Sequence, residues 1–219
     1  MRILVTGKSG QLGKSIYKVV NTSNNSQSFN DFSFVGREEL DLSSQDSINN
    51  YFSKNDRFNI IINCAAYTAV DKAEEEQDIA NQVNHLAVKQ LAEIAHKQQA
   101  KLIHVSTDYV FDGKSNKPYL ETDATNPINV YGKTKLAGEK ALQEIMPTNA
   151  IIIRTSWVYS EFSSNFVKTM IRLGQERDEL NVVSDQIGSP TYATDLAGAI
   201  FKIIEDKEFK KAGQATQIY

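Results

Sequence analysis

The sequence contains one cysteine, Cys64, in 219 residues, so the chain cannot form an internal disulfide. Its three histidines and this cysteine stand at no spacing typical of a metal site, and we predict no bound metal from the residues themselves. Long apolar runs are also absent. The first run, Ile3-Leu4-Val5, is too short for the core of a signal peptide, and no later run approaches the roughly 20 residues that cross a bilayer. We therefore expect a cytoplasmic protein without a membrane segment.

Excess charge of either sign is missing as well. The formal net charge is −3, which gives no electrostatic signature for nucleic acid or for an acidic membrane surface. Hydrophobic residues make up 41% of the chain and charged residues 23%, as in ordinary globular proteins. The length is sufficient for one α/β domain with a sizeable core, with or without a small additional lobe.

Apolar runs of strand length alternate with stretches of helical periodicity along the chain. The runs at residues 58–63, 101–107 and 150–156 are typical of interior parallel strands that are buried on both faces. Between them, residues 78–99 and 129–142 show helical spacing. We expect an α/β fold with a Rossmann-like, doubly wound parallel sheet. Further expectations are a loop at 21–31, short strands at 32–35 and 180–183, a helix at 165–173, and a helix capped by Thr194 or Asp195.

Three glycines follow the first apolar run at a regular spacing, Gly7, Gly10 and Gly13, and a helical pattern begins directly after them. A nucleotide pyrophosphate needs the backbone N–H groups at a helix N-terminus, and side chains at such a turn would keep the phosphates away. The spacing Gly-x-x-Gly-x-x-Gly departs from the usual Gly-x-Gly-x-x-Gly fingerprint. The pattern therefore favours a dinucleotide site, with an ordinary strand-to-helix turn as the alternative.

Arg37 stands just after the second predicted strand, where dinucleotide folds meet the adenosine ribose. A cation there, with Lys8 nearby, favours NADP(H), whereas a solvated surface charge is the alternative. Asp41 precedes a predicted helix that Ser43 or Ser44 would cap, so its carboxylate could accept from adenine or simply serve the helix N-terminus.

Small residues follow the strand at 58–63, and they would let a cofactor approach closely. They lead into Ala65, Ala66, Tyr67 and Thr68. The strand at 101–107 ends in Ser106 and Thr107, which should face the same crevice because ligands lie beyond the carboxyl ends of parallel strands. His85 and His96 fit the helical pattern around them and are interpreted as ordinary helix residues.

Tyr131 and Lys135 are four residues apart in a predicted helix, so both lie on one face of it. An ammonium group beside a phenol stabilises the phenolate, and we expect it to lower the pKa of Tyr131 toward neutrality. Such a pair can pass a proton to a carbonyl oxygen while a hydride reaches the carbonyl carbon. The pair alone is a weak motif, and its weight comes from the glycine turn and the strand-end hydroxyl in the same chain.

Six stretches of the sequence together resemble the extended short-chain dehydrogenase/reductase superfamily, and within it the dTDP-4-dehydrorhamnose reductase family. They are residues 5–13, 63–74, 105–113, 129–135, 154–159 and 185–191, which span nearly the whole chain. The resemblance implies a Rossmann-like enzyme that transfers a hydride from NADPH, or NADH, to C4 of a dTDP-linked 4-keto-deoxysugar and gives dTDP-L-rhamnose. It also allows a magnesium ion and a homodimer.

The resemblance further assigns roles to particular residues. Cofactor binding is implied for Gly10, Gln11 and Leu12 at the pyrophosphate, for Arg37, Asp41 and Leu42 near the adenosine, and for Ala65, Ala66, Tyr67 and Thr68 along the cofactor. Thr107 would hold the keto oxygen, Tyr131 would donate the proton, and Lys135 would bind the nicotinamide ribose. Asp108 and Trp157 would contact the sugar, although Trp157 could instead belong to the core.

Members of this family usually continue beyond the point where this sequence stops, so we expect a shortened substrate region. We divide the chain into an NAD(P)-binding Rossmann domain at residues 1–156, which carries the catalytic residues, and a partial substrate-binding lobe at 157–219, interleaved with the end of the sheet. Three alternatives remain. One is another sugar-nucleotide reductase, epimerase or dehydratase, although Tyr109 after Asp108 argues against a dehydratase. The second is an NADP-binding regulatory subunit of a methionine adenosyltransferase, and the third is a generic nucleotide-binding structural domain.

Overall fold

The computed structural model describes residues 1–22 and 31–219, and its strands and helices alternate through most of that length. The first half contains β1 (Arg2–Thr6), α1 (Gln11–Thr22), β2 (Asp31–Val35), α2 (Gln45–Lys54), β3 (Ile60–Asn63), α3 (Val70–Ala73), α4 (Gln77–Asn81), the π-helical turn η1 (Gln82–Leu86), α5 (Ala87–Gln98) and β4 (Lys101–Thr107). The second half contains the 3₁₀ turn η2 (Asp108–Val110), α6 (Val130–Ile145), β5 (Ala150–Thr155), β6 (Val158–Tyr159), α7 (Phe166–Glu176), β7 (Thr191–Tyr192), α8 (Ala193–Glu205), α9 (Lys207–Lys210) and β8 (Gln217–Ile218). Of the loop expected at residues 21–31, positions 23–30 lie outside the described residues, and the three others belong to α1 and β2.

The main sheet is parallel throughout its described pairs and has the strand order β2-β1-β3-β4-β5-β8. The order reverses between β1 and β3, because the chain moves from β1 outward to β2 and then crosses back to β3. A crevice for ligands forms at such a switch point, beyond the carboxyl ends of the strands. The expected doubly wound parallel sheet is confirmed.

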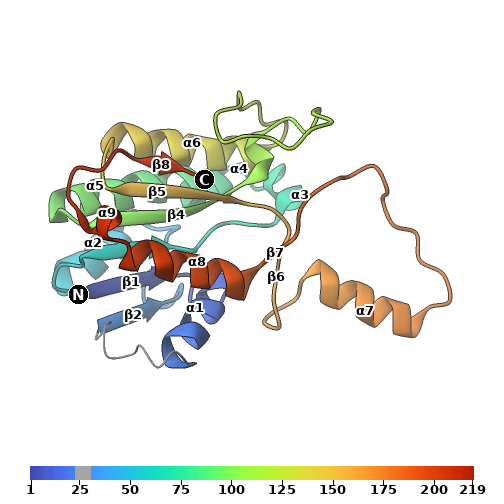
Figure 1. Cartoon of the computed structure of the whole chain (residues 1–219), viewed down its shortest axis with the longest axis horizontal. Helices are drawn as coiled ribbons and strands as arrows, with labels where there is room; N and C mark the ends of the chain where they lie inside the picture. Colours follow the sequence, from blue (N-terminus) through green and yellow to red (C-terminus); the bar gives the residue numbers. More distant parts are fainter. Residues whose placement is uncertain (23–30) are drawn as a thin grey trace.

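Helices cover both faces of this sheet, and Figure 1 shows the resulting three layers. Helices α2, α5 and α6 pack on one face, where Leu4, Ile61 and Leu102 point toward them. Helices α1 and α8 pack on the other face, against Ile3, Val5 and neighbouring residues. Successive residues of a strand point to opposite faces, so strands buried on both sides need the nearly continuous apolar sequence that predicted them.

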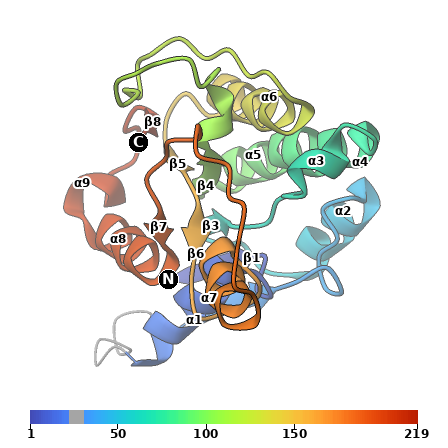
Figure 2. The same ribbon diagram turned by 90° about the vertical axis from the view of Figure 1, so that its right-hand side faces the viewer.

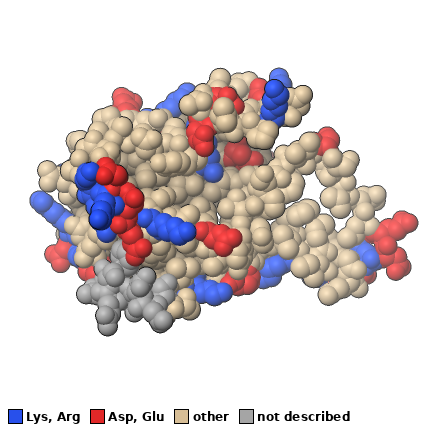
Figure 3. All heavy atoms as spheres, in the orientation of Figure 1, with Lys and Arg blue, Asp and Glu red and all other residues tan. Residues whose placement is uncertain are grey.

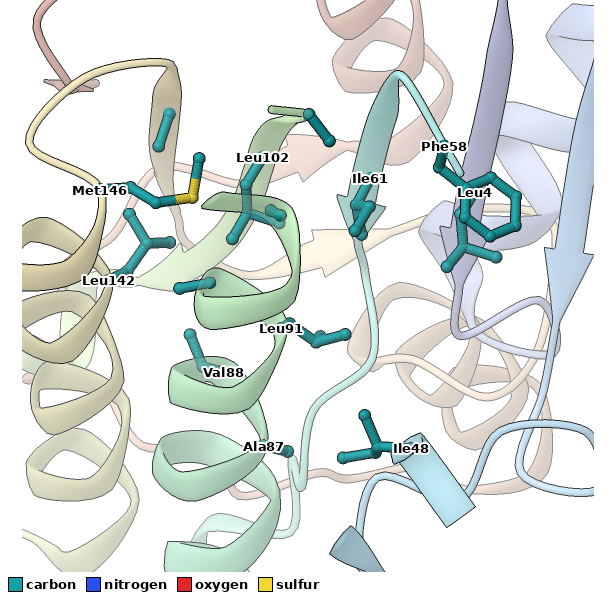
Figure 4. Packing of buried hydrophobic residues seen from close by; sticks show 14 of the residues in the cluster. Leu4, Ile48, Phe58, Ile61, Ala87, Val88, Leu91, Leu102, Leu142 and Met146 are labelled. Atoms are coloured by element: carbon teal, nitrogen blue, oxygen red, sulfur yellow. The ribbon is translucent and has the colours of Figure 1, made fainter. Parts of the chain in front are cut away.

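The core beneath α2, α5 and α6 is built from aliphatic side chains with few exceptions. Figure 4 shows Leu91 of α5 between the sheet residue Ile61 and Ile48 of α2, with Leu142 of α6 beside Leu102. Each of these five side chains is completely buried. Burial of a leucine or isoleucine side chain contributes about 1.5–3 kcal/mol, so this layer holds the helices firmly against the sheet.

Helix α7 is placed differently from the other long helices. It lies apart from the three layers in Figure 1 and in front of the carboxyl end of the sheet in Figure 2, and none of its residues is buried. The following residues 181–190 are exposed and form neither helix nor strand. The strand predicted at 180–183 is therefore wrong, because these residues pair with no neighbouring strand.

Two helix boundaries also differ from expectation. The helix predicted at 78–99 is divided into α4, η1 and α5, since a wider π-helical turn interrupts it at Gln82–Leu86. Helix α8 begins at Ala193 with Tyr192 at the N-cap position, so Thr194 and Asp195 lie inside its first turn and do not cap it. By contrast, Ser44 accepts from the backbone N–H of Ser47 and caps α2, as predicted.

Charged side chains of both signs are interspersed on the face drawn in Figure 3, with no large area of one sign. Among the described residues, no helix combines the length and the apolar character that a membrane crossing requires.

Candidate active site

A cleft of about 650 Å³ opens at the carboxyl ends of β1 and β3. Its lining brings together thirteen of the predicted site residues: Gly7, Gly10, Gln11, Leu12, Arg37, Asp41, Leu42, Ala65, Ala66, Tyr67, Thr68, Tyr131 and Lys135. Gly13, Thr107, Asp108 and Trp157 are not part of this lining. The volume falls within the range typical of small-molecule and cofactor sites.

The glycine turn has the geometry that a pyrophosphate requires. Gly7 has a φ of +73°, and a Cβ there would lie 2.9 Å from the backbone nitrogen of Ala65. The first bond of α1 runs from the Lys14 N–H to the Gly10 carbonyl at 3.0 Å. The N–H groups of Gln11, Leu12 and Gly13 therefore have no acceptor within the helix, and they form the positive end of its dipole. The residues present fit a dinucleotide phosphate at this end of the cleft.

The side chain of Gln11 ties this turn to the segment that leads to α7. Its Nε2 donates to the Val158 carbonyl at 3.0 Å, and its Oε1 accepts from Ser160 and Asn165 at 3.0 and 2.9 Å. These bonds occupy the side-chain oxygen and one of the two amide N–H donors of Gln11. The same bonds fix the start of α7 relative to the cofactor cleft.

At the adenosine end, Arg37 stands in the cleft with most of its guanidinium exposed. It lies 3.4 Å from both Asp41 Oδ2 and Ser43 Oγ. Asp41 also accepts from the Ser43 backbone and hydroxyl, and these hydrogen bonds outweigh its burial and lower the pKa of its carboxyl. Asp41 thus organises the turn before α2 and simultaneously faces the cleft. Lys8 forms an ion pair with Glu39, so its charge is compensated.

Asn84 supports the cofactor-lining loop and escaped the sequence analysis. Its side chain accepts from the Tyr67 N–H at 2.9 Å and donates to the Tyr67 carbonyl at 3.0 Å. It is buried in the π-helical turn η1, close to Gly138 of α6, where a Cβ would lie 2.2 Å from the Asn84 carbonyl oxygen. The sequence contains one indication of this role, which is that Asn84 is a polar residue within the predicted helix at 78–99. Polar residues are common in amphipathic helices, so this one did not stand out.

Tyr131 and Lys135 lie one turn apart near the start of α6, whose N-cap Asn129 accepts from the Gly132 N–H at 2.7 Å. The side chain of Thr107, at the end of β4, interacts with the Tyr131 phenol and lowers its pKa. Thr107 in turn contacts Asp108 Oδ1 at 3.1 Å. Tyr131 and Lys135 therefore both line the cleft, with Thr107 beside Tyr131, while the Lys135 amine is directed at the Val105 carbonyl.

The expected lowering of the Tyr131 pKa is wrong for this structure. Burial raises the pKa of Tyr131 to about 12, and the interaction with Thr107 opposes that rise only in part. Lys135 is not among the groups that shift it, and the Lys135 Nζ donates instead to the Val105 carbonyl at 2.7 Å. Tyr131 is therefore a neutral phenol at pH 7, which is the form that a proton donor needs.

Two further rows of buried polar residues cross the sheet beneath α6, and the sequence analysis missed both. In the first, Glu139 binds Arg154 at 2.7 Å and accepts from the Ser106 hydroxyl. In the second, Thr6, Asn63 and His104 stand side by side on β1, β3 and β4. The sequence indicated these rows only by placing polar residues near the carboxyl ends of strands that are otherwise apolar.

Trp157 does not belong to the core, because 42% of it is exposed. It packs on Phe166 at the start of α7, with ring centroids 5.9 Å apart, and has a φ of +47°. A bulky residue in the left-handed region is strained, and such strain is found preferentially at functional sites.

Among residues 1–22 and 31–219, no group of three or more His, Cys, Asp or Glu could hold a metal ion.

The parallel sheet, the glycine turn and the Tyr-x-x-x-Lys pair define a Rossmann-like protein of the short-chain dehydrogenase/reductase type. A family model described as the RmlD substrate binding domain matches residues 1–219, and the chain belongs to this family.

Named relatives agree with this assignment. The dTDP-4-dehydrorhamnose reductase of Aggregatibacter actinomycetemcomitans is 47% identical over 207 residues, which cover 93% of this chain and 67% of that protein. The enzyme of the same name from Escherichia coli is also 47% identical, over 90% of this chain and 64% of its own length. The chain thus spans about two thirds of these relatives.

One solved structure of similar sequence contains a bound cofactor. The dTDP-4-dehydrorhamnose reductase from Bacillus anthracis, in complex with NADP, has a TM-score of 0.87 and 40% identity, and the match covers 100% of this chain and 73% of that one.

Proposed function

We propose that this chain binds NADPH in the cleft and reduces the C4 keto group of dTDP-4-dehydrorhamnose to give dTDP-L-rhamnose. The observation that carries the proposal is a single cleft lined by Tyr131 and Lys135, with Thr107 beside Tyr131, that also holds the glycine turn and Arg37. The names of the curated relatives and the NADP complex of the Bacillus anthracis enzyme support it.

NADPH, when bound, supplies the hydride that reaches C4 of the sugar. The Thr107 hydroxyl donates a hydrogen bond to the keto oxygen, and the neutral Tyr131 phenol gives that oxygen a proton. Lys135 binds the nicotinamide ribose and returns a proton to Tyr131 after each turnover. The two groups have protonation behaviour that suits proton transfer. The Tyr131 phenol stays neutral at pH 7, and burial lowers the pKa of Lys135 to about 8.

Arg37 is the residue that favours NADPH over NADH. Its exposed guanidinium in the cleft can pair with a ribose 2′-phosphate, and Glu39, the acid beside the end of β2, is already paired with Lys8 and the Gly36 N–H. Asp108 and Trp157 are proposed to contact the sugar. Asp108 lies beside Thr107, and Trp157 packs on Phe166 at the start of α7.

The test is the consumption of NADPH, and separately of NADH, with freshly prepared dTDP-4-dehydrorhamnose, alongside direct titration of cofactor binding. Tyr131→Phe should abolish turnover and leave NADPH binding within about threefold, because one hydroxyl at the edge of the site is lost. Tyr51→Phe is the matched control, since Tyr51 lies on α2 outside the cleft lining.

Turnover that survives in Tyr131→Phe would refute the assigned proton donor. Tight NADPH binding without turnover would refute reductase activity for this chain and favour a cofactor-binding role, such as that of a regulatory subunit. The same assay on a fusion carrying the C-terminal third of the Aggregatibacter relative would separate lost sugar binding from missing chemistry.

A further inference from the structure

A row of buried polar side chains crosses three interior strands of the sheet and ends at Lys135. Thr6, Asn63 and His104 are direct neighbours in the parallel register of β1, β3 and β4. Each is at most 1% exposed, and so is Lys135, which reaches them from α6. Interior parallel strands are normally apolar at such positions, so four adjacent polar side chains call for a physical role.

Hydrogen bonds connect this row from end to end. The Thr6 hydroxyl donates to Asn63 Oδ1 at 2.7 Å, and Asn63 Nδ2 lies 3.0 Å from His104 Nδ1. His104 Nε2 lies 3.4 Å from Lys135 Nζ. The backbone N–H of Ala65, a residue that lines the cleft, donates to the Thr6 hydroxyl at 3.3 Å.

The chemistry of these groups determines where the proton of His104 lies. Burial holds the pKa of His104 well below its usual value, and Lys135 lowers it further whenever that amine is charged, so the ring is neutral in either state of Lys135 and carries one N–H. The Asn63 amide nitrogen can only donate, and it faces Nδ1, so Nδ1 accepts. The ring proton is therefore on Nε2, directed at Lys135. An ammonium group has no lone pair, so only a neutral Lys135 amine can accept from Nε2–H.

We propose that Thr6, Asn63 and His104 form a positioning unit that governs whether Lys135 holds its proton. The arrangement in the structure favours the neutral amine. Protonation of Lys135 requires the His104 ring proton to move to Nδ1 and the Asn63 amide to turn, so that Nε2 can accept from the ammonium and Asn63 Oδ1 can accept from Nδ1. The Lys135 proton and the His104 tautomer therefore change together.

The other groups around Lys135 act in the opposite direction and are weaker than burial. Glu139, one turn later on α6, and Cys64, after β3, each raise the pKa of Lys135, while burial lowers it to about 8. The charge of Glu139 is already shared with Arg154, and burial raises the pKa of the Cys64 thiol to about 12, so that thiol is neutral. This balance leaves Lys135 near the pH at which a group both gives and accepts a proton readily.

This inference rests on the proposed reductase only for its consequence, which is the return of a proton to Tyr131. The unit itself can be tested in the free protein. Imidazole ¹⁵N spectra report the His104 tautomer, and ¹³Cε shifts report the titration of Lys135. We expect the Nε2–H tautomer on the alkaline side of a Lys135 pKa at or below about 8, and Nδ1–H on the acidic side, with the same midpoint. Nδ1–H throughout, or a Lys135 pKa near the ordinary 10.5, would overturn the proposal.

Thr6→Val provides the second test, because Thr6 lies outside the cleft lining and valine keeps its shape. Without the hydroxyl, Asn63 is free to turn, so we expect more Nδ1–H tautomer and a Lys135 pKa higher by about one unit, the equivalent of one hydrogen bond. Thr216→Val is the control: its hydroxyl bonds the Met146 carbonyl far from this row in sequence, and it should change neither signal.

Kinetics then separate positioning from structural support. In Thr6→Val, the pH dependence of kcat should move to higher pH together with the Lys135 titration. A uniform loss of kcat at every pH, with both spectroscopic signals unchanged, would assign the row a structural role and overturn the proposal. Because the spectra need no turnover, failure of the reductase assay would not be confused with failure of this inference.

Discussion

Gly13→Ala tests the close approach between α1 and the glycine turn. A Cβ at Gly13 would lie 2.2 Å from the Gly7 carbonyl oxygen, 2.9 Å from the Gly7 carbonyl carbon and 3.0 Å from the Lys8 Cα. All three are backbone atoms, so no flexible side chain can move aside. Since nonbonded carbon and oxygen atoms need more than 3 Å, the helix and the turn must separate by about 1 Å.

The magnitude follows from this displacement. Overpacking of a tight contact costs about 1–3 kcal/mol, and alanine recovers up to about 1 kcal/mol of helix propensity, so the free energy of unfolding should fall by about 1–2 kcal/mol. Cofactor binding should suffer more, because the amides of Gln11 and Leu12 move relative to the pyrophosphate. We expect NADPH affinity to fall at least about tenfold, since a shift of 1 Å weakens several charge-assisted hydrogen bonds at once.

Gly198→Ala is the matched control, because Gly198 lies in α8 and an added Cβ there meets nothing within 4 Å. It should gain up to about 1 kcal/mol in stability and leave NADPH affinity unchanged. Urea unfolding and NADPH titration of both variants give the comparison. If Gly13→Ala binds NADPH as tightly as the unchanged protein, the close approach does not position the pyrophosphate and this reasoning is refuted.

Three other perturbations follow from the structure. Arg37→Ala should weaken NADPH about ten- to hundredfold and leave NADH within about twofold, as one charge-assisted contact is lost; equal losses in the two titrations would contradict this. Glu139→Gln should lower the unfolding free energy by about 3–5 kcal/mol in urea, because Arg154 is 9% exposed and loses its counter-charge, whereas an exposed pair would lose at most about 1 kcal/mol. His104 should make stability fall as the pH drops below 6.5, by up to about 1.4 kcal/mol per unit, because the unfolded chain takes up a proton that the buried ring refuses. Unfolding curves at several pH values should lose this slope in His104→Phe.

The sheet and its helices could be predicted because their signals are local. Residues 58–63 and 150–156 are apolar on both faces, and only interior parallel strands use such sequences. The strand expected at 180–183 had similar composition, with Val182 and Val183 adjacent, yet both side chains are more than half exposed. β-Propensity reflects packing against a neighbouring strand, and the sequence does not reveal whether a neighbour exists.

The candidate site was harder to predict from the sequence, because the buried polar residues beneath it become neighbours only through strand register. Thr6, Asn63 and His104 are about 40 or more positions apart in sequence, and they become neighbours only when β1, β3 and β4 align as they do here. No pairwise spacing in the sequence encodes that alignment. The cleft-lining glycines and the Tyr131 and Lys135 pair were found because each depends on a single turn or one helix.

The pKa of Tyr131 could not be predicted from the spacing within one helix. A spacing of four residues places Tyr131 and Lys135 on one face of α6, but it does not determine where the four-carbon lysine side chain ends. Lys135 Nζ lies against the Val105 carbonyl and His104, which belong to β4, and burial is therefore the largest influence on the pKa of the Tyr131 phenol. A phenol with a raised pKa is protonated at pH 7 but is a weak acid, and its phenolate readily takes a proton back from a neighbouring group of lower pKa. The group that must do this, Lys135, is connected to the buried row of Thr6, Asn63 and His104, which the helical spacing could not reveal.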